Sequence, residues 1–475
     1  MPHSKIITQK KAKTTDAANQ NDGMEIEMAR EKSNFTKKLI RLVLPIAFQQ
    51  FMLALVSASD ALMLGMLSQD ALSAVSLAGQ ITFVENLFLT AMTIGLSMFA
   101  AQYWGKGDIP NVERIFAYVL KITAAVAFLF FVVACLKPAA LMRIFTSDET
   151  LIAGGACYLQ VVSFSYFLTG ISQIYLCILK NTDRAILAGT ISSVSVVMNI
   201  LLNAVFIFGL FGLPKMEIAG AALATVLARV IEVLWCVLET TKKGSVCLRW
   251  KYCKERTNPL KHDFWKYTAP VLGNEIVWGG GFTMYSVIMG HLGSDAVAAN
   301  SVANIVKNLI VCFCLGLGSG GGIIIGNELG AGNLDTAKEY GRKVCRLAIF
   351  SGLISGAVML LISPLILANC NLYATSKEYL KWMLVLCAVY MVGKSVNGAT
   401  IGGIFCAGGD SKFGLLCDGI TMWCVTVPLG FVSAFVWKWP VLAVFLIINL
   451  DEIVKLPAVY RHYKKYLWVR DLTKP

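Results

Sequence analysis

Four ionisable side chains stand inside long apolar stretches of the sequence. Asp60 is the single ionisable residue over 42–67, and Glu275, Lys394 and Asp418 lie in later stretches of the same kind. A run of this length exceeds the ~20 apolar residues with which a helix crosses a bilayer. Charged residues inside such helices usually face an interior cavity and serve the movement of ions or substrates. The chemistry open to these residues is therefore proton or cation exchange within a membrane.

Side-chain amides occur in the same apolar stretches. Asn199 and Asn203 are four residues apart, so they share one face of a helix. Gln50 precedes Asp60, and Asn274 directly precedes the second acid. These amides have two interpretations, because a polar network around an ion site and hydrogen bonds that join packed helices look alike in sequence.

The acid at Glu275 belongs to an internal repeat. Pro45 and Pro270 are 225 positions apart, and the same offset places Gln50 on Glu275 and a glycine turn near 105 on one near 330. Similarity at one fixed offset is typical of duplicated architecture. The repeat therefore predicts two halves with one plan, in which this polar position became acidic in one copy only.

Composition indicates a polytopic membrane protein. The chain has 475 residues, of which 56% are hydrophobic and 15% charged, far from the balance of a soluble domain. The net charge is +13, but the basic residues show no face or stripe of the kind that binds nucleic acid. The 14 cysteines include no CxxC pair, and no HExxH or GxSxG motif occurs. The sequence therefore predicts no enzyme, no cofactor and no structural metal.

Twelve spans are predicted, and all should be helical, because lipid offers backbone groups no hydrogen-bond partner. They cover 37–66, 71–103, 114–136, 151–179, 185–210, 217–241, 262–291, 296–328, 339–368, 376–406, 411–437 and 440–462.

Lysine and arginine bias predicts the orientation of these spans. Residues 1–41 carry nine of these basic residues and residues 242–266 carry eight, whereas 68–70 and 293–295 carry none. We therefore expect both termini and the central linker to be cytoplasmic. Six spans per copy bring both copies into the membrane from the same side, related by a pseudo-two-fold axis along the membrane normal.

The expected organisation is a disordered cytoplasmic tail (1–36), an N-terminal lobe (37–241), a basic linker (242–261), a C-terminal lobe (262–465) and a cytoplasmic tail (466–475).

Four stretches together resemble the multidrug and toxic compound extrusion (MATE) family over residues 35–465. They are SASDALMLGMLSQDALSAVSLA (57–78), NILLNAVFIFGLFGLPKMEIAGAALATVLAR (199–229), GNELGAGNLDTAKEYGRK (326–343) and IFCAGGDSKFG (404–414). The resemblance implies a V-shaped pair of six-helix lobes in the cell membrane, with a central cavity. It also implies export of small organic, often cationic, compounds by antiport against protons or sodium, and we expect a monomer.

The resemblance also implies roles for individual residues. Asp60 corresponds to the acid of the amino-terminal proton or cation site, and Asn199 and Asn203 to a polar network around it. Some members carry aspartate where Asn203 stands, so this chain has one titrating group fewer there. Glu275 corresponds to an acid that is essential in several members.

Lys394 stands near the place where members with a carboxyl-terminal sodium site carry a carboxylate. A lysine in apolar surroundings either pairs or loses its proton, and we expect Asp418 or Glu275 to pair with it. Protons are therefore the expected coupling ion, with sodium as the alternative. A flippase for lipid-linked saccharides is a further alternative that a strongly cationic cavity would favour.

The other embedded charges predict helix-stabilising pairs. Arg229 and Glu232 are three residues apart on the sixth span, and Asp451, Glu452 and Lys455 have similar spacing on the twelfth. The sequence assigns no role to Glu85 or Lys307.

Overall fold

The computed structural model describes residues 3–242, 245–255, 259–370 and 372–474, with side chains from Phe35 onward. Every regular element within these ranges is a helix, which confirms the all-α class. The first half comprises α1 (His3–Leu67), α2 (Gln69–Lys106), α3 (Ile109–Leu136), α4 (Pro138–Met142), α5 (Glu149–Asn181), α6 (Ala185–Phe208), η1 (Leu210–Gly212), α7 (Glu217–Thr240) and α8 (Trp250–Lys254).

The second half has more irregular helices. It comprises α9 (Lys261–Gly290), α10 (Ser294–Gly330), α11 (Leu334–Asn369), α12 (Ala374–Asn397), η2 (Gly398–Phe405), α13 (Lys412–Asp418), η3 (Gly419–Thr426), α14 (Val427–Phe431), η4 (Val432–Val436), α15 (Val441–Ile448), α16 (Asp451–Val454) and α17 (Leu456–Tyr463). The elements η2, η3 and η4 are π-helical, a geometry that is frequent at functional sites.

Ten helical segments among the described residues are long and apolar enough to cross a membrane. The α9 helix, with its embedded polar residues, is outside this group. The predicted twelfth span over 440–462 is also outside it, because the chain there forms three short helices, α15, α16 and α17, instead of one. Pro457 lies in the first turn of α17, where its missing N–H and its ring end the preceding helix.

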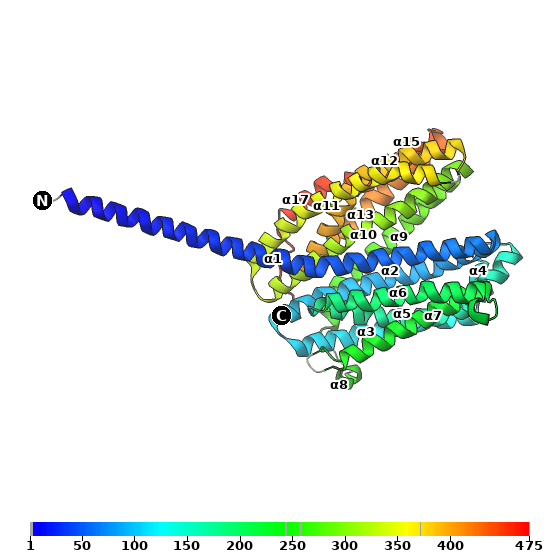
Figure 1. Cartoon of the computed structure of the whole chain (residues 1–475), viewed down its shortest axis with the longest axis horizontal. Coiled ribbons are helices and arrows are strands. Elements are labelled where there is room, and N and C mark those ends of the chain that lie inside the picture. Colours follow the sequence, from blue (N-terminus) through cyan, green and yellow to red (C-terminus); the bar gives the residue numbers. More distant parts are fainter. Residues whose placement is uncertain (1–2, 243–244, 256–258, 371, 475) are drawn as a thin grey trace.

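The helices form two lobes, one from each half of the chain (Figure 1). The α1 helix packs on α10, and α2 packs on both α9 and α10. We call the end of the molecule where α2 ends at Lys106 and α10 ends at Gly330 the linker side. The lobes lie close together on the linker side and separate toward the other side, as a V (Figure 1).

Two glycines make this close approach possible. A Cβ atom at Gly105 would collide with the backbone of Asn327, and one at Gly330 would collide with the backbone of Gln102. Helices α2 and α10 therefore cross backbone to backbone on the linker side. These are the two glycine turns that the internal repeat equates.

The first helix is longer than the sequence predicted. Residues 3–34 continue α1 as a rod that projects away from both lobes (Figure 1), whereas a disordered tail was expected over 1–36. This stretch contains no proline and one glycine, so a helix can satisfy its backbone hydrogen bonds internally.

The C-terminal residues 466–474, which we call the C-terminal strap, connect the two lobes. Trp468 is completely buried. Gln102 of α2, also buried, donates from Nε2 to the carbonyl of Arg470 (3.1 Å) and accepts from the amide of Leu472 (2.6 Å). The sequence predicted a tail over 466–475, and nothing in its pattern indicated this packing.

Candidate ion-coupling sites

Asp60 lies half-buried in α1 and faces α6. Its Oδ1 accepts a hydrogen bond from Asn203 Nδ2 at 2.6 Å. The same Nδ2 also donates to Asn199 Oδ1 at 3.2 Å, and Asn199 Nδ2 donates to the hydroxyl of Thr225 in α7 at 3.3 Å. The four-residue spacing on α6 thus aligns both amides behind the carboxylate. The structure brings Asp60, Asn199 and Asn203 together as one chain of hydrogen bonds.

The amide of Asn203 has an unused acceptor. Its Oδ1 is buried and has no hydrogen-bond partner among the described residues. A buried amide oxygen without a donor costs free energy. Rotation of the Asn203 amide would offer this oxygen to a protonated Asp60, so the same residue can serve both protonation states of the acid.

A second buried acid of this lobe lies on α2. Glu85 is 1% exposed, and its Oε1 has no hydrogen-bond partner within the described part of the chain. Arg229 acts electrostatically on both Asp60 and Glu85 and forms a 2.6 Å ion pair with Glu232. The predicted pair on the sixth span is therefore confirmed.

The C-terminal lobe contains a network of buried ion pairs. Lys394 Nζ lies 3.1 Å from Glu452 Oε1, and Lys455 Nζ bridges Glu452 Oε2 (3.1 Å) and Asp418 Oδ1 (2.8 Å). Asn397 donates to both Glu452 Oε2 and the Glu452 carbonyl at 2.7 Å. Glu452 is 1% exposed, and every charge in this chain of contacts has an opposite charge beside it.

The expected partners of Lys394 were wrong. Its ammonium pairs with Glu452 and lies 5.2 Å from the centre of the Trp278 ring. Asp418 is instead held by Lys455. The break between α15 and α16 brings residues 451–455 to the depth of Lys394, and a sequence pattern for one continuous helix does not show this.

The remaining candidates are less closely connected. Glu275 acts electrostatically with Lys394 and Asp418 but forms an ion pair with neither. The Oδ1 of Asn274 is buried without a hydrogen-bond partner among the described residues. Gln50 lies ten residues before Asp60, about 15 Å along the helix, so it does not join the Asp60 chain.

The extent of the C-terminal network does not follow from the sequence pattern. The predicted pairing of Glu452 with Lys455 is confirmed by the 3.1 Å contact, although Lys455 lies between α16 and α17. The contacts of these two residues with Lys394 and Asp418 were not predicted. The available signal was the density of charge over 451–455 in an apolar stretch. Lys307, which had no assigned role, lies with its ammonium 5.1 Å from the centre of the Tyr390 ring.

Comparisons with known proteins agree with this architecture. The family profile named MatE matches residues 45–205 and 270–432, more than half of the chain. The two matches begin at the prolines that the internal repeat equates. The uncharacterized transporter YisQ of Bacillus subtilis is 22% identical over 93% of this chain and 97% of its own length. A probable multidrug resistance protein NorM of Bacillus cereus is 25% identical over 86% of this chain and 92% of its own.

Solved structures share the fold. A MOP superfamily transporter from Pyrococcus furiosus, described as having a binding pocket of reverse polarity, superposes with a TM-score of 0.83 at 16% identity, over 91% of this chain and 96% of its own. A mutant MATE transporter of Vibrio cholerae superposes with a TM-score of 0.84 at 17% identity, over 92% and 99%. These likenesses establish the two-lobe fold of this chain.

Proposed function

Because the chain belongs to the MATE family of multidrug efflux transporters, we propose that it is a secondary antiporter that exports organic, often cationic, compounds in exchange for protons. Asp60 is the residue that takes up and releases the coupling proton. Alternating access of the two lobes then links this protonation to export, because a proton can bias two conformations only if they bind it differently.

The observation that carries the choice of proton is the surroundings of Asp60. The carboxylate meets the N–H donor of Asn203 at 2.6 Å, and no second carboxylate contacts it among the described residues. A sodium ion needs several oxygen ligands, whereas in this arrangement Asn203 turns its N–H donor, and not its oxygen, toward Asp60. A proton needs one carboxylate and a neighbour that serves both of its charge states.

The orientation follows from the basic residues. With both termini and the linker in the cytoplasm of a cell whose plasma membrane holds the protein, the linker side is the cytoplasmic side. The lobes then separate toward the exterior, which is the outward-facing arrangement of an exporter.

Membrane vesicles test the coupling ion directly. Export of a fluorescent organic cation should follow an imposed pH gradient at zero sodium, and a protonophore should collapse it. A strict requirement for a sodium gradient at constant pH would overturn the proton assignment, while retention of export under either gradient would preserve the antiporter function.

Sodium coupling is the second candidate, and one feature favours it. The Oδ1 of Asn274 is buried without a hydrogen-bond partner among the described residues, beside the unpaired acid Glu275. Two adjacent oxygen-bearing side chains could contribute ligands to a cation. In the vesicle assay, a sodium requirement that Glu275→Gln removes would identify this site as the coupling site.

A further inference from the structure

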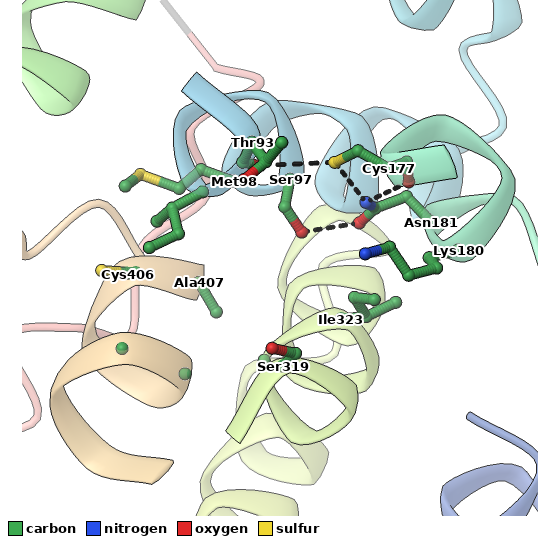
Figure 2. A pocket seen from close by; sticks show the side chains of 14 residues that line it. Thr93, Ser97, Met98, Cys177, Lys180, Asn181, Ser319, Ile323, Cys406 and Ala407 are labelled. Atoms are coloured by element: carbon green, nitrogen blue, oxygen red, sulfur yellow. Dashed lines mark hydrogen bonds between the residues drawn. The ribbon is translucent and has the colours of Figure 1, made fainter. Parts of the chain in front are cut away.

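A small cavity lies between the two lobes, where α2, α5, α10 and η2 meet (Figure 2). Its volume is about 90 Å³, which is room for several water molecules or one small ion. Ser97 and Lys180 line it from the N-terminal lobe, and Ser319 and Gly402 line it from the C-terminal lobe. The cavity is thus complete only while the lobes are together at this level.

Lys180 differs from the paired lysines of the C-terminal network. It projects from α5 into the cavity (Figure 2), yet it forms no ion pair and no hydrogen bond with any residue that the structure describes. Lys394 and Lys455, by contrast, each contact a carboxylate within 3.1 Å. Lys180 is only partly buried and is the penultimate residue of α5, so its ammonium lies at the linker-side end of this helix without a counter-charge among the described residues.

Neighbouring groups limit how this charge can be compensated. The Ser97 hydroxyl donates a hydrogen bond to Asn181 Oδ1 at 2.9 Å, and the Cys177 thiol donates one to the Thr93 carbonyl. Glu275 acts electrostatically on Cys406 at another wall but does not pair with Lys180. The hydroxyl of Ser319 has no hydrogen bond within the described part of the chain, so it remains a free donor on the opposite wall.

We propose that this cavity binds a small anion with one negative charge, held by the Lys180 ammonium and the Ser319 hydroxyl. One ammonium matches one negative charge, and the volume suits a halide or a short carboxylate. Because the two donors come from different lobes, the bound anion stabilises the conformation in which the linker side is closed. This inference goes beyond the proposed antiport and does not depend on which cation is coupled.

Binding is measured on the purified full-length chain, without transport. The midpoint of thermal unfolding should rise with chloride or acetate concentration when sodium gluconate keeps ionic strength constant, since gluconate is much larger than either anion. Equilibrium dialysis with radioactive chloride should give saturable binding close to one ion per chain. The chloride and acetate arms distinguish a halide from a carboxylate ligand.

Two kinds of variant separate the charge from the space. Lys180→Met removes the charge, and Gly402→Leu fills the cavity, because a Cβ at Gly402 meets no atom within 4 Å. Each should abolish the anion-dependent shift and the saturable chloride binding. Lys180→Arg should retain both. Lys121→Met, which removes an exposed lysine on α3, is the matched control and should behave like the unaltered chain.

Three results would overturn the proposal. They are a wild-type chain that binds neither anion, an anion effect that survives both Lys180→Met and Gly402→Leu, and an effect that Lys121→Met removes equally. The first would mean that Lys180 is a neutral amine in this cavity. Because no step of the assay uses a proton or sodium gradient, failure here leaves the proposed antiport unaffected.

Discussion

In the N-terminal lobe Asp60 meets an amide, with Asn203 Nδ2 at 2.6 Å, whereas in the C-terminal lobe Glu452 and Asp418 meet Lys394 and Lys455 within 3.1 Å. A proton added to Asp60 breaks no ion pair. A proton added to Glu452 would leave Lys394 without its carboxylate partner and Lys455 with Asp418 alone, which is unfavourable. The contrast teaches that burial alone does not make an acid a proton carrier. The partner of the acid decides whether its charge can change during a transport cycle.

The largest effect is expected from disrupting the buried ion pairs of the C-terminal network. Lys455→Met leaves Asp418 without its lysine and Glu452 with only Lys394, and breaking a buried pair in this way costs about 3–5 kcal/mol. We expect a large fall in the midpoint of thermal unfolding and in the monodisperse fraction after solubilisation. Lys338→Met, which removes an exposed pair with Asp335, should cost about 0.5 kcal/mol or less. Equal effects of the two changes would contradict the network's structural role.

The opposite profile is expected in the N-terminal lobe. Asp60→Asn should abolish proton-coupled export, because an amide neither takes up nor releases a proton at working pH. It should leave the unfolding midpoint far less altered than Lys455→Met, since an amide can still hydrogen-bond to Asn203. Vesicle transport and thermal unfolding of the same preparation measure both effects. Full pH-driven export by Asp60→Asn would remove this acid from the mechanism.

A subtler change tests whether the amide partner selects the ion. Asn203→Asp places a second carboxylate beside Asp60 and removes a charge-assisted hydrogen bond of about 1.5–3 kcal/mol. We expect export driven by pH alone to fall roughly tenfold, where tenfold corresponds to about 1.4 kcal/mol, and sodium to restore part of it.

The control for Asn203→Asp lies on the same helix. Ser195→Ala removes a buried hydrogen bond to the carbonyl of Ala228 without touching Asp60. It should leave the dependence of export on pH and sodium unchanged. A sodium response in the control, or none in Asn203→Asp, would show that the amide does not select the coupling ion.

The smallest effect is expected from cutting the peptide chain between the two lobes. Cutting the chain after Glu255 and co-expressing the halves should restore a complex that still exports, because each half keeps its own network and α1 and α2 repack on α9 and α10. Co-purification of the halves is the measurement. Reporter fusions in the same linker should remain cytoplasmic, and an external location would reverse the proposed orientation.

Much of the architecture followed from local pattern. Hydropathy and the 225-position repeat gave the order of the helices, because lipid imposes helical structure on each apolar run. The spacing of Asn199 and Asn203 also indicated a shared face. These features depend on residues close in sequence or on one repeated offset.

The contacts between distant spans could not be predicted in the same way. The pairing of Lys394 with Glu452 depends on the break before α16, and that of Lys455 with Asp418 depends on how η3, which begins directly after Asp418, packs on α16. Several arrangements of the same helices would satisfy the apolar pattern equally well. The choice among them is made by the pairing of buried charges, which a single sequence does not reveal.

The C-terminal strap opposes opening of the linker side. For the linker side to open, Gln102 must release Arg470 and Leu472, and its third hydrogen bond, to the carbonyl of Ala407 at 2.7 Å, must also break or follow. At about 1 kcal/mol for each bond, the two bonds to Arg470 and Leu472 favour the closed arrangement by roughly thirtyfold in population. Residues 466–474 then oppose opening of the linker side, and a tag that displaced this strap would shift the balance from the closed toward the open arrangement.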